Sequence, residues 1–261
     1  MIPSALDHVQ EIAGGRHHAL AVFLDYDGTL TPITNRPEQA VLSHSMRTVL
    51  RALAAKVPAA ILSGRDLQDV RRRVGIDAIV YAGSHGFDIA GPGGLRRQMA
   101  TEFLPYLDIA EKELHNALDG IPGAFVERKH FSIAAHYRNV DANCVPEVRR
   151  LVDALAAHHP ELRRIDGKKV YELLPNVDWD KGKALLWLLG TLDLDPPSRG
   201  IRPIYIGDDS TDEDAFRALE SEERGGVGII VTEHPRQSAA RYMLKDSGEV
   251  ELFLRNLNAG L

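Results

Sequence analysis

AVFLDYDGTLT, residues 21–31, joins a run of apolar residues to two carboxylates and a glycine. Residues 21–24 are apolar and long enough for a buried strand, and Asp25 and Asp27 follow where that run ends. Alternate residues of an extended segment project from the same face, so both carboxylates can address one ligand. Gly28 then permits a sharp turn. Although Asp-x-Asp alone is also typical of a capped loop, the whole stretch predicts a binding site at the carboxyl end of a strand, where open α/β sheets bind ligands.

Apolar segments of strand length alternate with segments of helical periodicity along much of the chain. Besides residues 21–24, we expect strands at 59–62, 79–82, 204–206 and 227–231, and helices at 45–56, 66–74, 181–189 and 212–219. This alternation predicts an α/β fold with a doubly wound, mostly parallel sheet of Rossmann-like type. Residues 246–261 predict a final packing helix, with Val250, Leu252, Phe253 and Leu257 at helical spacing.

The middle of the chain has a different order of elements. We expect a helix at 106–118, a strand pair within 124–138, a second helix at 145–158 and a second strand pair within 162–174. An αββαββ run inside a βαβ chain predicts an inserted α/β cap domain. The expected division is a core of residues 1–104 and 176–261 and a cap of residues 105–175.

Composition narrows the classes of function. The chain has 261 residues, 44% hydrophobic content and a formal net charge of −6. Its Lys and Arg residues are dispersed among Asp and Glu, which argues against a nucleic-acid or anionic-membrane surface. Cys144 is the single cysteine, so an internal disulfide is excluded, and we expect this thiol to be buried. Because no apolar run predicts a spanning helix or an export signal, we expect a cytoplasmic protein.

Three further polar clusters follow apolar segments. They are ILSGR at residues 61–65, WDKGK at residues 179–183 and YIGDDSTDED at residues 205–214. Taken singly, each has a structural explanation, because Ser63 fits a helix cap, Lys181 a solvated lysine and the acidic run a helix N-terminus. Taken together with residues 21–31, and in this order, they resemble the four motifs of the haloacid dehalogenase phosphatase superfamily.

The resemblance implies a Mg²⁺-dependent phosphatase that works through an aspartyl-phosphate. Asp25 would be the nucleophile and Asp27 the general acid and base, while Ser63 and Lys181 would bind phosphate oxygens. Mg²⁺ would be held by Asp25, the main-chain carbonyl of Asp27 and Asp208. Two more acidic residues of the fourth motif would stand behind these ligands, namely Asp209 and Asp212.

Polar and apolar side chains alternate in the predicted cap strands. In residues 132–138, Ile133, Ala135 and Tyr137 share one face, and the polar residues share the other. An antiparallel sheet with one solvated face explains most of this pattern without any ligand. The segments ERKHFSIAAHYR, residues 127–138, and GKKVYELLP, residues 167–175, also resemble the cap of trehalose-6-phosphate phosphatases, as does GSHG at residues 83–86.

This second resemblance implies trehalose 6-phosphate as substrate and a functional link to a trehalose-6-phosphate synthase. The sugar contacts that it implies in the cap are Glu127, Lys129, Ser132, His136, Arg138, Lys168 and Glu172, with Arg65 and His85 on the core side. Other interpretations stay open. They are a phosphatase for sucrose phosphate, glucosyl-phosphoglycerate or a monosaccharide phosphate, a phosphosugar mutase, and a non-catalytic phosphosugar-binding regulator.

Overall fold

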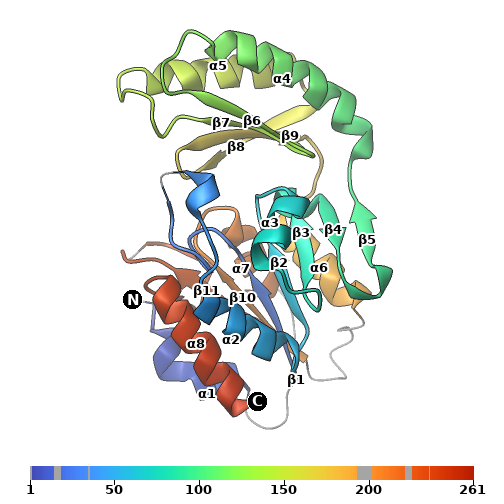
Figure 1. Cartoon of the computed structure of the whole chain (residues 1–261), viewed down its shortest axis with the longest axis vertical. Coiled ribbons are helices and arrows are strands. Elements are labelled where there is room, and N and C mark those ends of the chain that lie inside the picture. Colours follow the sequence, from blue (N-terminus) through green and yellow to red (C-terminus); the bar gives the residue numbers. More distant parts are fainter. Residues whose placement is uncertain (1, 15–18, 35, 193–200, 221–224, 235) are drawn as a thin grey trace. The chain divides into compact units, whose positions relative to one another are not determined.

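The computed structural model describes residues 2–14, 19–34, 36–192, 201–220, 225–234 and 236–261. The chain divides into two compact units (Figure 1). The first comprises Met1–Arg96 and Trp179–Leu261, and the second comprises Arg97–Asp178, within which the expected cap lies. None of the helices in the described ranges combines the length and the apolar character that a membrane-spanning segment needs.

An eight-stranded sheet has the order β12-β11-β10-β1-β2-β3-β4-β5. The strands from β12 to β3 are parallel, and β4 pairs antiparallel with β3. Their bounds are β1 Ala19–Leu24, β2 Ala59–Leu62, β3 Val80–Gly83, β4 Asp88–Ala90, β5 Arg96–Gln98, β10 Ile201–Gly207, β11 Val227–Val231 and β12 Tyr242–Leu244. β1 lies between β10 and β2, so its carboxyl end adjoins the ends of both neighbours.

Helices cover both faces of this sheet (Figure 1). They are η1 Ala5–His8, α1 Val9–Ile12, α2 His44–Ala54, α3 Leu67–Val74, α6 Lys181–Thr191, α7 Asp212–Glu220 and α8 Ser247–Gly260. Leu20, Val22 and Leu24 of β1 pack with α2, α3 and α8, whereas Ala21 and Phe23 pack with α6 and α7. Because both faces are covered, the strand reads as one continuous apolar run in the sequence.

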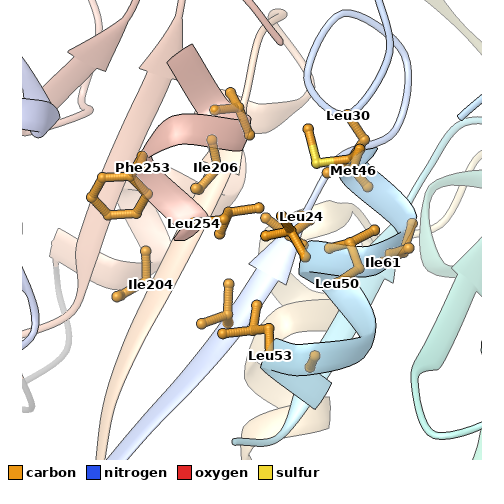
Figure 2. Packing of buried hydrophobic residues seen from close by; sticks show 14 of the residues in the cluster. Leu24, Leu30, Met46, Leu50, Leu53, Ile61, Ile204, Ile206, Phe253 and Leu254 are labelled. Atoms are coloured by element: carbon orange, nitrogen blue, oxygen red, sulfur yellow. The ribbon is translucent and has the colours of Figure 1, made fainter. Parts of the chain in front are cut away.

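Figure 2 shows the first of these two clusters around Leu24 of β1. Leu50 and Leu53 of α2 approach from one side, and Phe253 and Leu254 of α8 approach from the other. All of these side chains are buried. This packing fixes the position of β1, and therefore of the residues that follow it.

Side-chain caps determine where several helices begin. The capping residues, each of which accepts a hydrogen bond from a backbone N–H two or three residues later, are Ser43 for α2, Asp66 for α3, Asp180 for α6 and Asp246 for α8. Such caps satisfy donors that the helix itself leaves unpaired. The cap at Asp180 matters most for the site, because it makes Lys181 the first residue of α6.

The second unit contains an antiparallel sheet of order β6-β7-β9-β8. Its elements are α4 Leu104–Leu118, β6 Phe125–Lys129, β7 Ser132–His136, α5 Val145–His158, β8 Leu162–Gly167 and β9 Val170–Pro175. Ile133, Ala135 and Leu173 on one face of the sheet pack against α4 and α5. The predicted αββαββ order is therefore confirmed, and the opposite face carries the polar residues.

Three features differ from expectation. The strands β4, β5 and β12 were not expected, and β4 pairs antiparallel with β3. Cys144 is exposed at the start of α5, so the predicted burial of its thiol was wrong. Leu252, which was predicted to pack, is 47% exposed. Leu254 packs instead, because residues 250, 253, 254 and 257 form the buried stripe of α8.

Candidate active site

The first carboxylate lies at the carboxyl end of β1. The N–H of Asp25 donates to the carbonyl of Ile206 in β10, 2.9 Å away, so Asp25 continues the sheet, and its side chain is buried. The chain then turns at Gly28, whose φ is +86°. A Cβ at Gly28 would lie 1.7 Å from Oδ2 of Asp208. Only glycine therefore allows the Asp208 carboxylate to stand against this turn.

Lys181 brings a positive charge to the buried carboxylates. Its Nζ lies 2.8 Å from Oδ1 of Asp25 and 2.8 Å from Oδ1 of Asp212, and its side chain is 2% exposed. Burial by itself would lower the pKa of Lys181, but the charges of Asp212 and Asp25 raise that pKa well above its usual value. The ammonium therefore stays charged inside the protein, as a fixed cation beside Asp25.

Asp212 organises the turn that follows β10. Its Oδ1 accepts hydrogen bonds from Lys181 and, at 2.7 Å, from the hydroxyl of Tyr205. Its Oδ2 accepts from the backbone N–H groups of Asp208 at 2.8 Å and Asp209 at 3.0 Å. A carboxylate has about four lone-pair sites, so these contacts occupy the capacity of Asp212 and fix both Lys181 and the loop.

The acidic side chains of this region suit a metal ion. Asp25, Asp208 and Asp212 each place one carboxylate oxygen within 4.8 Å of the others, and all three are buried. Burial raises the pKa of Asp25 well above its usual range; Lys181 opposes this, and neighbouring carboxylates add to it. One ammonium does not neutralise three buried carboxylates, so this all-oxygen set fits a hard divalent cation. The prediction named Asp25 and Asp208 with the carbonyl of Asp27, and the structure brings Asp212 to the same place.

Ser63 and His85 come from the neighbouring strands. The Oγ of Ser63, just after β2, accepts a hydrogen bond from the N–H of Arg65 at 3.1 Å. After β3, Ser84 and His85 have φ values of +47° and +58°, a conformation that costs a residue with a Cβ about 1–2 kcal/mol. A Cβ at Gly64 would lie 2.9 Å from the His85 ring. The strained turn therefore holds this ring directly against the loop that carries Ser63.

Arg65 and Asp27 contact each other. The guanidinium Nε lies 2.6 Å from Oδ2 of Asp27, and Nη2 lies 2.6 Å from Oδ1. Burial alone would lower the pKa of Arg65, but its hydrogen bonds and ion pairs with Asp27 and Asp69 raise it. Arg65 was predicted to bind substrate, and in the structure its charge is directed to these carboxylates.

In the second unit, the carboxylate of Glu172 accepts hydrogen bonds from two side chains. Its Oε1 accepts from Nζ of Lys129 at 2.8 Å and from Oγ of Ser132 at 2.5 Å. The three residues come from β9, β6 and β7, which are neighbours in the sheet, and they occupy the face opposite α4 and α5. The structure thus brings three of the predicted sugar contacts together.

The remaining predicted cap residues form two smaller contacts. Nε2 of His136 lies 2.8 Å from Oε2 of Glu127, and this hydrogen bond lowers the pKa of Glu127. Arg138 donates from Nη2 to the carbonyl of Lys168 at 2.8 Å, so it contacts the main chain of that residue. Whether any of these side chains touches a sugar stays a prediction.

Two residues of the site, Tyr205 and Asp69, were not predicted. Tyr205 lies inside the apolar run of β10, and its buried hydroxyl donates to Asp212. Since a buried tyrosine usually finds a hydrogen-bond partner, a tyrosine in a strand just before an acidic motif was the available signal. Asp69 follows Arg65 by four residues, the spacing of a helical ion pair, and accepts from its Nη1 at 2.9 Å.

Three features of the fold and the site define the class of this protein. A buried aspartate follows the central strand, a lysine begins a crossover helix, and an acidic turn follows the adjacent strand. These are the features of a phosphatase of the haloacid dehalogenase superfamily. The trehalose-phosphatase family model matches residues 23–248. The chain is 42% identical to "Probable trehalose-phosphate phosphatase D" of Arabidopsis thaliana, over 98% of this chain and 72% of that protein. It belongs to the trehalose-phosphatase family.

Two further similarities agree with this assignment. The chain is 40% identical to "Trehalose-phosphate phosphatase B" of Arabidopsis thaliana, over 98% of this chain and 71% of that protein. The solved C-terminal domain of the C. albicans trehalose-6-phosphate phosphatase superimposes with a TM-score of 0.86 at 21% identity, covering 99% of this chain and 98% of that chain. The latter similarity shows that the two chains share a fold.

Proposed function

We propose that this chain hydrolyses trehalose 6-phosphate to trehalose and inorganic phosphate, with Asp25 as the nucleophile. The observation that carries the proposal is the buried pair of Asp25 and Lys181, 2.8 Å apart at the carboxyl end of β1. A carboxylate that approaches a phosphate dianion meets a repulsion of about 4 kcal/mol per pair of unit charges at about 4 Å and an effective dielectric constant of about 20. Lys181 supplies a preorganised positive charge that offsets this repulsion.

The proposed reaction has two half-reactions that balance in atoms and protons. In the first, a carboxylate oxygen of Asp25 bonds to phosphorus, the bond from phosphorus to the sugar oxygen breaks, and a protonated Asp27 gives its proton to that oxygen. In the second, water bonds to phosphorus, Asp27 takes the proton of that water, and the bond to Asp25 breaks. Ser63 and Lys181 bind the phosphoryl oxygens throughout.

We assign the cation to Mg²⁺, held by Asp25, the main-chain carbonyl of Asp27 and Asp208. When bound, Mg²⁺ supplies positive charge that neutralises the phosphoryl group and the surrounding carboxylates. Asp209 and Asp212 would orient these ligands from behind. The four hydrogen bonds that Asp212 already accepts support this outer role.

Recognition of the sugar is assigned to polar side chains. Charged and hydroxyl groups that already pair with one another on a sheet face can exchange those bonds for sugar hydroxyls. The proposed contacts are Glu127, Lys129, Ser132, His136, Arg138, Lys168 and Glu172 in the second unit, with His85 in the first. Arg65 is not among them, because its guanidinium pairs with Asp27 and Asp69. The class of reaction that supplies this substrate is a glycosyl transfer onto a hexose 6-phosphate, so we expect a functional link to a trehalose-6-phosphate synthase, in the cytoplasm.

Phosphate release with a panel of sugar phosphates, with Mg²⁺ and with excess chelator, tests the proposal. We expect turnover of trehalose 6-phosphate that needs Mg²⁺ and exceeds turnover of sucrose phosphate and glucosyl-phosphoglycerate. Asp25→Asn should release no phosphate and should trap none on the protein. Preference for another sugar phosphate would reassign the substrate, an isomerised phosphosugar without free phosphate would indicate a mutase, and binding without turnover would indicate a regulator.

A further inference from the structure

Arg65 makes a bidentate contact with the carboxylate of Asp27. Nε donates to Oδ2 and Nη2 donates to Oδ1, each at 2.6 Å. This paired geometry matches the planar guanidinium to the planar carboxylate and fixes the rotation of both groups. The side chain of Asp27 is 35% exposed, whereas that of Arg65 is 10% exposed. The buried arginine therefore determines where the more exposed aspartate points.

The other N–H groups of Arg65 are anchored as well. Nη1 donates to Oδ2 of Asp69 at 2.9 Å, and Nη2 donates to the carbonyl of Pro37 at 2.8 Å. The guanidinium carbon also lies 5.3 Å from the centre of the Tyr26 ring. A guanidinium has five N–H donors, and these contacts engage four of them. At most one donor is left for a substrate, so the geometry favours a role toward Asp27.

Asp69 connects this contact to the first turn of α3. Its Oδ2 also accepts from Nε of Arg73 at 2.6 Å, and its Oδ1 accepts from Nη2 of Arg72 at 2.7 Å. Nη1 of Arg73 donates a hydrogen bond to the carbonyl of Ala40, which also accepts one from the hydroxyl of Tyr26. The chain of contacts from α3 to Asp27 thus runs through Asp69 and Arg65, and all of it lies within the first unit.

We propose that Arg65 is a positioning residue for proton transfer by Asp27, and that Asp69 in turn positions Arg65. The inference rests on the proposed function, in which Asp27 gives a proton to the departing sugar oxygen. Each oxygen of Asp27 accepts one hydrogen bond from Arg65 and keeps a second lone-pair site, where that proton can reside. Proton transfer requires the donor within about 2.6–3.2 Å of the acceptor oxygen. The bidentate contact with Arg65 restricts Asp27 to one orientation.

The test compares phosphate esters whose leaving groups differ in their need for a proton. A sugar alkoxide leaves only with a proton, whereas 4-nitrophenolate leaves readily without one. Because Asp27 also acts as the base of the second half-reaction, which both esters share, the first half-reaction is followed alone in a single turnover. For Arg65→Met, we expect its rate constant with trehalose 6-phosphate to fall by about 100-fold, the lower range of general acid contributions, and at least tenfold more than with 4-nitrophenyl phosphate. Asp27→Asn should give the same pattern, and adding Arg65→Met to it should change little.

Two variants separate this role from a structural one. Asp69→Asn, which leaves Arg65 in place, should shift the leaving-group dependence in the same direction by a smaller factor. Arg72→Met is the matched control, because Arg72 also contacts Asp69, does not contact Asp27 in the described structure, and has a side chain that is 78% exposed. We expect this control to behave like the wild-type protein with both esters.

The outcomes are distinguishable from a failure of the proposed function. A rise in KM for trehalose 6-phosphate with unchanged kcat would make Arg65 a substrate contact and overturn the inference. Equal losses of the first half-reaction's rate constant with both esters, in Arg65→Met and Asp69→Asn, would indicate a structural role and also overturn it. Either outcome would leave the proposed nucleophile, Asp25, and the proposed substrate unchanged. An active Asp25→Asn variant would instead overturn the proposed function itself.

Discussion

Replacing Gly28 by alanine tests whether the turn after β1 and the Asp208 carboxylate depend on each other. The added Cβ would lie 1.7 Å from Oδ2 of Asp208, whereas nonbonded carbon and oxygen atoms stay about 3.3 Å apart. The carboxylate oxygen would therefore have to retreat by about 1.6 Å. Mg²⁺ accepts oxygen ligands only near about 2.0–2.1 Å in an almost ideal octahedron, so a shift of this size removes Asp208 from the proposed metal site.

Gly94→Ala is the control for the backbone effect. Gly94 has a φ of +80°, close to the +86° of Gly28, but nothing lies within 4 Å of its added Cβ. Gly94→Ala should lose about 1–2 kcal/mol of unfolding free energy, the cost of left-handed backbone for alanine, and Gly28→Ala should lose at least as much, both measured by urea titration. Only Gly28→Ala should also weaken Mg²⁺ binding, by about 10–100-fold, measured by calorimetry and by the Mg²⁺ dependence of phosphate release. A Gly28→Ala enzyme with wild-type Mg²⁺ affinity would refute this reasoning.

Three other substitutions or modifications probe separate parts of the structure. Lys181→Met leaves two buried carboxylates without their cation, so we expect a loss of about 3–5 kcal/mol in urea unfolding and no phosphate release; unchanged stability would contradict the buried ion pair. Glu172→Gln removes the charge that binds Lys129, and we expect KM for trehalose 6-phosphate to rise about tenfold or more. An unchanged KM would contradict a role of Glu172 in binding the sugar. The exposed thiol of Cys144 should react with Ellman's reagent in the native protein at full phosphatase activity, and a reaction only after denaturation would count against the described exposure.

Sequence patterns predicted the strands and helices whose cause is local. The strand expected at 59–62 and the helix expected at 145–158 agree with β2 and α5 residue for residue, because apolar run length and helical periodicity carry their signals. The helix expected at 66–74 begins one residue later, since Asp66 is its cap. β5 could not be predicted, because its three exposed residues, Arg96–Gln98, have no apolar alternation. Its pairing depends on the strand beside it.

The same distinction applies to the site. Asp25, Lys181 and Asp208 could be predicted, because their motifs stand at strand and helix ends that the apolar pattern already marks. The pairing of Arg65 with Asp27 could not, because it joins residues 38 positions apart in the sequence. The local pattern in fact favoured a substrate contact for this arginine. Ion pairs across a turn require the positions of both elements, which a periodicity argument does not supply.

Where the structure departs from local preferences, the departures concentrate at one edge of the sheet. Ser84 and His85 are consecutive left-handed residues in a buried turn, and Asp25 and Lys181 are charges in the interior. Two other residues are also left-handed. Lys169 lies in the tight turn between β8 and β9, where such a conformation follows from hairpin geometry, and Ala100 immediately precedes the short helix Thr101–Phe103. No similar local reason applies to the other four. Since a fold retains such costs mainly where function requires them, their position supports the active site proposed at the carboxyl ends of β1, β2 and β3, independently of any motif.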